Sequence, residues 1–186
     1  MKTALILIDI QNDYFPKGKR ELEGSVEASL QAKNILDFFR QKKWPIFHVQ
    51  HISRSPQGTV FLPNTEGVHL HSNVQPLGSE PVIQKHHVNC FRETSLLDLL
   101  RQGQVTRLVI LGMMTHMCVH AAARAAFDFG FECVILHDAC ATRALSFHGQ
   151  TIPARQVHAS FLAALSGVYG QVMGVEEFIS MTGSRE

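Results

Sequence analysis

The stretch LVILGMMTHMCVHAAARAA, residues 108–126, places an apolar run of strand length before an alanine-rich segment of helix length. Gly112 ends the apolar run, and Thr115 and Cys118 lie immediately before the alanines. A strand that leads directly into a helix is the repeating unit of parallel α/β proteins. The stretch therefore predicts a strand-to-helix junction whose cysteine is either a reactive nucleophile or a small buried filler.

The same alternation continues along the rest of the chain. Apolar runs of strand length occupy residues 3–10, 46–52, 81–85, 107–112, 132–139 and 170–173. Segments of helical period occupy residues 26–43, 93–103, from about 116 onward, 153–165 and from 175 onward. This order is typical of a parallel sheet that is covered by helices on both faces.

Composition narrows the class of protein. With 186 residues, of which 45% are hydrophobic and 18% charged, the chain fits one compact domain, residues 1–186. Its 17 basic and 16 acidic side chains give no sign of nucleic acid or of an anionic membrane, so we expect a small-molecule ligand. The first apolar run is short and ends at Asp9, which indicates a buried strand instead of a signal peptide. Four cysteines without a C-x-x-C spacing favour reduced thiols in the cytoplasm.

Residues 53–80 show no convincing periodicity and contain several prolines and glycines. So long an irregular segment inside a compact domain is usually functional or mobile. We therefore expect this loop to contribute to a binding site.

Three residues lie at the carboxyl ends of expected strands, namely Asp9, Lys85 and Gly112. The carboxyl ends of parallel strands meet at one edge of the sheet, where ligands of open α/β folds bind. Near the first turn of a helix, backbone N–H groups and the helix dipole favour the thiolate of Cys118 and lower its pKa from about 8.5. The same N–H groups could stabilise an oxyanion.

Asp9 is the expected base for the thiol proton, and Lys85 could hold that carboxylate ionised and lower the pKa of the cysteine. Each residue by itself has a plainer explanation: Cys118 as a core filler, Asp9 as a turn or cap residue, and Lys85 as a solvated strand end. The combined pattern favours chemistry, although spacing alone does not show that the three side chains meet.

Several motifs together resemble those of the isochorismatase-like cysteine hydrolases, a superfamily that includes nicotinamidases, carbamoyl-amide hydrolases and isochorismatase. They are LILIDIQNDYF, Lys85 followed by NCF at residues 89–91, GMMTHMCV and GFECVILHDACA. The resemblance runs from about residue 5 to residue 178. It implies a three-layer α/β/α fold with a Rossmann-like parallel sheet of about six strands.

The resemblance also implies roles for single residues. Asp9, Lys85 and Cys118 match the catalytic aspartate, lysine and cysteine of the family, in which the cysteine attacks an amide carbon to form a thioester that water then hydrolyses. A cis peptide is expected between Met113 and Met114, and the amides of Met114 and Cys118 are expected to form the oxyanion hole. No cofactor is implied, and members of the family commonly form homodimers or homotetramers. We therefore expect a homo-oligomer, and the alanine-rich helix or the last helix could provide its interface.

The chain departs from the metal-using nicotinamidases. Those enzymes have an Asp-x-His group after the second strand, whereas residues 50–53 read QHIS. His51, His69 and His71 could bind a metal, but histidines without an acidic anchor are weak evidence, so we expect no metal. Isochorismatase itself lacks the cysteine and cleaves a vinyl ether, so Cys118 favours the amide hydrolases.

Substrate choice is expected to depend on Tyr14, Phe15, Phe91, His116 and the loop of residues 53–80. The leading hypothesis is a cytoplasmic, cysteine-dependent hydrolase of a small amide or related C–N bond.

Two alternatives stay open. A catalytically silent member could use the same pocket for binding a small ligand or for subunit assembly, although it would have no physical need for all three polar groups. A thiol redox enzyme would need Cys90 or Cys140 to come close to Cys118.

Overall fold

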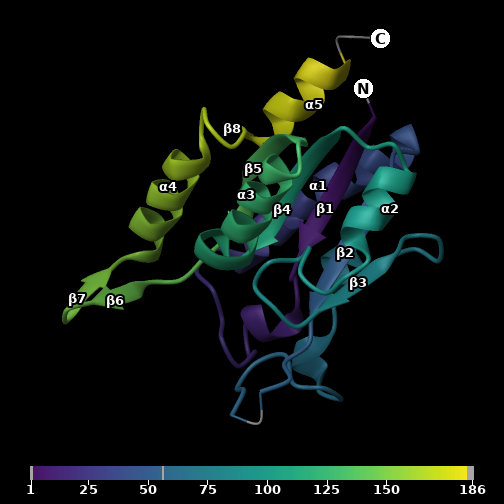
Figure 1. Cartoon of the computed structure of the whole chain (residues 1–186). Helices are drawn as coiled ribbons and strands as arrows, with labels where there is room; N and C mark the ends of the chain where they lie inside the picture. The colour runs from purple at the N-terminus through teal and green to yellow at the C-terminus, as the bar shows by residue number, and fades with distance from the viewer. Residues whose placement is uncertain (1, 56, 184–186) are drawn as a thin grey trace.

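The computed structural model describes residues 2–55 and 57–183, so the expected domain of residues 1–186 includes five residues outside that description. Six strands form one parallel sheet in the order β3-β2-β1-β4-β5-β8 (Figure 1). The strands are β1 (Thr3–Ile8), β2 (Ile46–His51), β3 (Val82–Lys85), β4 (Arg107–Met113), β5 (Glu132–Ala141) and β8 (Gln171–Met173). This sheet agrees with the six strand-length runs that the sequence predicts.

Five α-helices cover the sheet. They are α1 (Ser25–Lys42), α2 (Leu96–Gln102), α3 (His120–Asp128), α4 (Ala154–Leu165) and α5 (Val175–Gly183). From β1 the chain proceeds outward to β2 in one direction, and from β4 it proceeds outward to β5 in the other. Because crossovers between parallel strands are right-handed, α1 and α3 come to lie on opposite faces, as Figure 1 shows. The three-layer α/β/α fold is thereby confirmed.

The central position of β1 explains why its sequence is apolar from Ala4 to Ile8. β1 pairs with β2 on one side and β4 on the other, and all six of its residues are buried. A strand that is covered on both faces has no solvent side, so polar residues do not alternate along it.

None of the described helices combines the length and the apolar character that crossing a membrane requires.

Two features of the structure had no signal in the sequence. A small hairpin, β6 (Leu145–Phe147) paired antiparallel with β7 (Gln150–Ile152), projects from the body beyond β5 (Figure 1). Each of its strands has three residues, too few for a hydrophobic period to be recognised. The helix after β4 also starts differently from the expectation, because Thr115–Val119 form a π-helical turn, η4, before α3 begins.

The long loop of residues 53–80 is docked against the chain that follows β1. Leu70 forms an isolated antiparallel bridge with Gln11, and the amide of His71 donates to the carbonyl of Ile10. Two 3-10 turns, η2 (Glu66–Val68) and η3 (Ser72–Val74), interrupt the irregular backbone, and Val68 and Val74 are buried. The loop therefore has a fixed position beside the carboxyl edge of the sheet.

Candidate active site

The carboxyl edge of the sheet brings together the three residues that the sequence singled out. Asp9 directly follows β1, Lys85 is the last residue of β3, and Cys118 lies in η4 after β4. Asp9 and Lys85 have no exposed surface, and Cys118 is 5% exposed. A buried carboxylate, ammonium and thiol at one position are costly to bury unless they satisfy one another.

The Lys85 ammonium is the centre of this arrangement. Its Nζ atom lies 2.7 Å from Asp9 Oδ2, 3.0 Å from His51 Nδ1, 3.1 Å from the carbonyl oxygen of His87 and 3.4 Å from Cys118 Sγ. Burial lowers the pKa of Lys85, but the neighbouring Asp9 and Cys118 more than offset it and leave the pKa above its ordinary value. The side chain is therefore a cation at neutral pH. We call Asp9, His51, Lys85 and Cys118 the Lys85 cluster.

The Cys118 thiol differs from the expectation of a lowered pKa. Burial raises the pKa of Cys118 well above its usual range, the charge of Asp9 raises it further, and Lys85 offsets only part of this. The helix start, which was expected to lower the pKa of Cys118, is outweighed by burial, because the thiol has almost no contact with water. The resting sulfur is therefore protonated and needs a base, and an Asp9 carboxylate oxygen lies within 4.8 Å of it.

The junction between β4 and η4 depends on backbone geometry. Gly112 has φ +126°, and a Cβ atom there would lie 2.1 Å from the carbonyl oxygen of Ile8, so only glycine fits between the two strands. The peptide bond between Met113 and Met114 is cis, as the resemblance implied. Thr115 Oγ1 donates to the carbonyl of Ala141 at 3.3 Å, which ties the start of η4 to β5.

Asp9 is presented by an unusual backbone conformation. Its φ of 51° lies in the left-handed region, which is uncommon for residues other than glycine, although aspartate tolerates it better than most. Its amide donates to the carbonyl of Val49, and its own carbonyl accepts from the amide of Gln11. Residues held in this way cluster at functional sites.

The expected substrate residues occupy different surroundings. Burial raises the pKa of Tyr14, and the nearby charges of Asp9 and Cys118 raise it further, which places this side chain close to the Lys85 cluster. Phe15 stacks on His71 with ring centroids 3.7 Å apart, and Phe91 packs edge-on against Phe129 at 5.3 Å.

His116 lies on η4 itself. Its Nδ1 atom is 2.5 Å from Thr142 Oγ1, and its ring packs edge-on against Phe161. The charges of the Lys85 cluster thus act on Tyr14, whereas the ring contacts of Phe15, Phe91 and His116 are with residues outside this cluster.

The structure also places residues at the site that the sequence reasoning missed or assigned differently. His51 contacts Lys85, and the buried ring of Phe61 lies 4.7 Å from Tyr14 and 5.8 Å from His51. His51 ends β2, so the strand-end argument that selected Asp9 and Lys85 applies to it equally. Phe61 lies in the irregular loop and had no such signal.

The three histidines considered for a metal do not assemble. His69 Nδ1 pairs with Glu66 at 3.3 Å, while His71 stacks on Phe15 and accepts from the amide of Asn73. Within residues 2–55 and 57–183, the one group with three closely spaced metal-ligand atoms is Asp9, His51 and Cys118. The Lys85 ammonium contacts all three, so a side-chain cation already lies where a metal would bind.

Comparison with known proteins agrees with this fold. The family model of the Isochorismatase domain matches residues 3–167. The chain is 46% identical over 179 residues to the uncharacterized isochorismatase family protein YddQ of Bacillus subtilis (strain 168), covering 96% of this chain and 99% of the relative. Nicotinamidase 3 of Arabidopsis thaliana is 27% identical over 161 residues, 80% of this chain and 78% of the relative.

A solved structure extends the likeness to three dimensions. The crystal structure of a protein from Oleispira antarctica, assigned to the isochorismatase hydrolases, matches with a TM-score of 0.93 and 44% identity over 96% of both chains. Sequence and structure thus agree over nearly the whole chain. The chain therefore belongs to the isochorismatase family of hydrolases.

Proposed function

We propose that this hydrolase cleaves a small amide or related C–N bond through a thioester on Cys118. One observation carries the proposal: a fully buried Lys85 ammonium contacts both the Asp9 carboxylate and the Cys118 sulfur. A carboxylate base, a cation that stabilises it and a thiol are the parts that nucleophilic cysteine chemistry needs. The likeness to a nicotinamidase supports an amide as the substrate class.

In the first half of the reaction Asp9 accepts the Cys118 proton while the sulfur attacks the carbonyl carbon. The carbonyl oxygen takes up the negative charge, and we assign its stabilisation to the amides of Met114 and Cys118. The C–N bond then breaks, the nitrogen leaves as ammonia or amine with the proton from Asp9, and a thioester remains. Because the thiol has a raised pKa at rest, proton transfer must accompany the attack.

In the second half a water molecule replaces the leaving group. Asp9 takes a proton from this water, the water oxygen attacks the thioester carbon, and the C–S bond breaks. The sulfur regains the proton from Asp9, and the acid product leaves. Lys85 stays protonated throughout and keeps the Asp9 carboxylate in position. No step requires a cofactor or a metal.

Access to the sulfur favours a small substrate. Cys118 is 5% exposed, and the bordering Tyr14 is 3% exposed. A bulky polymer or a folded protein could not reach the thiol through so little open surface. We therefore propose a small molecule as the partner of this site, and the near-neutral net charge gives no reason to propose nucleic acid or a membrane.

The test is intact mass spectrometry combined with ammonia release, using a panel of small amides, carbamoyl compounds and nicotinamide. We expect release by the wild type, a trapped acyl adduct on Cys118, and neither in Cys118→Ala. Cys133→Ala is the matched control, since Cys133 is another buried thiol, located in β5 away from the Lys85 cluster. Full activity of Cys118→Ala would contradict the proposal.

A catalytically silent, ligand-binding protein is the second candidate. Alkylation by iodoacetamide does not separate it from the enzyme, because the raised pKa of Cys118 predicts slow alkylation in both cases. Binding of a panel amide without an adduct or ammonia would favour the silent protein. Acyl transfer to Cys118 favours the enzyme.

A further inference from the structure

His51 contributes an acceptor to the Lys85 cluster. A lysine ammonium has three N–H donors and no acceptor, so at a separation of 3.0 Å His51 Nδ1 must accept. An Nδ1 atom that accepts carries no proton, so the proton of the neutral ring is on Nε2. The contact itself therefore determines both the charge and the tautomer of this histidine.

The surroundings of His51 keep it neutral. Burial lowers the pKa of His51 to about 4, and the adjacent Lys85 cation acts in the same direction. The other charged or titratable groups near the ring are Asp9 from the end of β1, which acts in the opposite direction, Cys118 of η4, whose sulfur lies within 4.8 Å, and His86 and His87, which follow β3. At neutral pH the ring is consequently an uncharged acceptor beside a buried cation.

Gln11 holds the backbone of His51. Gln11 Oε1 accepts from the His51 amide at 2.8 Å, and Gln11 Nε2 donates to the His51 carbonyl at 2.9 Å and to the carbonyl of Val68 at 2.7 Å. Gln11 has no exposed surface. A buried amide whose donors and acceptor all bond to backbone groups, here those of His51 and Val68, is a rigid clamp, because breaking it leaves unpaired polar groups.

The ammonium donates hydrogen bonds to His51 Nδ1, to the carbonyl of His87 and to Cys118 Sγ, and it forms an ion pair with Asp9 Oδ2. Asp9 Oδ2, His51 Nδ1 and the His87 carbonyl lie at 2.7, 3.0 and 3.1 Å. Cys118 Sγ lies farther away, at 3.4 Å. Removing the imidazole frees one N–H, and the ammonium can then rotate or shift away from the line between Asp9 and Cys118.

We propose that His51 is a positioning residue, a neutral acceptor that fixes the Lys85 ammonium between Asp9 and Cys118 while Gln11 holds the histidine in place. This inference rests on the proposed function, because the position of the ammonium matters most if Asp9 and Cys118 exchange a proton. It also explains the glutamine between two aspartates in the D-x-Q-x-D motif of residues 9–13.

Two substitutions separate positioning from packing. His51→Ala removes the acceptor, whereas the Oδ1 atom of Asn in His51→Asn can stand near the position of Nδ1. We expect His51→Ala to lower kcat for ammonia release roughly 10- to 100-fold with little change in KM. We expect His51→Asn to keep most of the wild-type kcat. His69→Ala, at an exposed histidine paired with Glu66, is the control and should behave as wild type.

The pH profile supplies a readout that a packing role would not move. Protonation of His51 would remove the acceptor and place a second cation beside Lys85. We expect kcat of the wild type to fall as the pH drops through the His51 pKa of about 4, and His51→Asn to lack this component. Asp9 is present in both proteins, so the difference between their profiles reports His51.

Nitrogen NMR of histidine-labelled protein tests the geometry without activity. We expect the His51 signals of a neutral ring protonated on Nε2 at pH 7. A cationic ring, or one protonated on Nδ1, would overturn the inference even if His51→Ala failed to fold.

The kinetic outcomes separate the two proposals. If Cys118→Ala stays active, the proposed function fails. If Cys118 is required and His51→Ala matches the wild type, only the positioning role fails. Equal losses in His51→Ala and His51→Asn would also overturn it, since they would indicate packing.

Discussion

At the scale of the residue, the chemistry of this site depends on charges that have no contact with water. Lys85 and Asp9 form an ion pair of 2.7 Å in which neither side chain is exposed. Removing one partner of such a pair leaves the other charge buried alone, which costs far more than the pair contributed as a whole. Stability and reactivity are therefore coupled through the same two side chains.

Lys85→Met tests this coupling. It keeps an unbranched side chain but leaves Asp9 without its cation, so we expect a loss of about 3–5 kcal/mol in the free energy of unfolding. Urea denaturation measures it. The control is Lys33→Met, whose exposed pair with Asp37 should be worth no more than about 1 kcal/mol. Equal effects of the two substitutions would show that the Lys85 charge is not held as tightly as the distances indicate.

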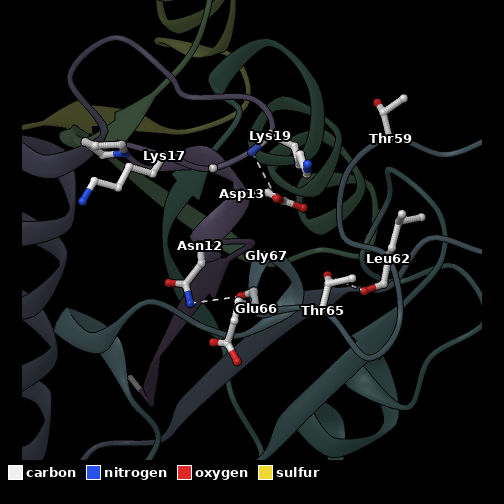
Figure 2. A pocket seen from close by; sticks show the side chains of 11 residues that line it. Asn12, Asp13, Lys17, Lys19, Thr59, Leu62, Thr65, Glu66 and Gly67 are labelled. Carbon is white, nitrogen blue, oxygen red and sulfur yellow. Dashed lines mark hydrogen bonds between the residues drawn. The ribbon is translucent and has the colours of Figure 1, made fainter.

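At the scale of the element, the loop of residues 53–80 is attached to the rest of the fold near both of its ends. Near its start the buried Asp13 carboxylate accepts from the amides of Phe61 and Lys19. Asp13 also lines a surface pocket of about 300 Å³. Figure 2 shows the side chains of this pocket, with Asp13 near Lys19 and Gly67. A Cβ atom at Gly67 would lie 2.1 Å from Asp13 Oδ1, so the loop passes directly over the carboxylate.

Phe61 depends on that carboxylate. It is a buried aromatic residue with φ +56°, a conformation that costs on the order of 1–3 kcal/mol and needs a compensating contact. Asp13→Ala leaves the Phe61 amide unpaired, so we expect a loss of about 1–3 kcal/mol in the free energy of unfolding. We also expect hydrogen exchange to become faster than in the wild type in residues 57–80, and to change less in β1. Asn12→Ala, which removes a bond to the Glu66 carbonyl at the surface, should change the stability little. Unchanged exchange in Asp13→Ala would refute the attachment.

The far end of the loop is held by Glu80. Its carboxylate accepts from Arg40 of α1 at 2.7 and 2.9 Å and lies 2.9 Å from His48 Nε2 of β2. Burial raises the pKa of Glu80, but Arg40, the amide of Leu77 and His48 more than offset it and lower the pKa to about 2. One carboxylate thus joins a helix, a strand and the loop.

The pH dependence of stability follows from this shift. The pKa of Glu80 is about 2 in the folded protein, against an ordinary value of 4.5, so the stabilisation from its ionised carboxylate is fully present above about pH 4.5 and is lost as the pH falls toward 2. In thermal unfolding we expect Glu80→Gln to be less stable than the wild type at pH 6. The difference in unfolding temperature between the two proteins should narrow near pH 2.5. The exposed Glu66→Gln is the control and should show no such convergence. A gap that stayed constant with pH would rule out the ionised Glu80 as its source.

At the scale of the whole molecule, the hairpin of β6 and β7 stands out from the body (Figure 1), and Phe147 in it is 67% exposed. A two-stranded hairpin is marginally stable in water without a packing surface. Homodimers or homotetramers are the assemblies expected from the family resemblance, and a second copy of this chain would provide such a surface. We therefore expect the hairpin to contribute to a homo-oligomer.

Phe147→Asp tests this expectation by light scattering after size-exclusion chromatography. A charge in an apolar contact between copies should shift the mass toward a smaller species at micromolar concentration. Val168→Asp, at an exposed position after α4, is the control for surface charge alone. If the wild type is a monomer, or if both variants keep the assembly, the hairpin does not join copies.

The sequence by itself determined the sheet and its strand ends, and it singled out the side chains that the structure brings together there. Strands buried on both faces need near-continuous apolar runs, so β1, β4 and β5 were readable, and Asp9, Lys85 and Cys118 followed from the ends of the runs and the junction after Gly112.

Only the tertiary structure decided what surrounds those side chains. The contact of His51 with Lys85, the raised pKa of Cys118 and the position of Phe61 depend on strand order and on burial by loops distant in sequence. Local periodicity contains no information on strand order or on burial by distant loops. Desolvation, which reversed the expected shift at Cys118, is a property of the packed molecule and exists only once the segments of residues 9–15, 51–61 and 85–91 have come together.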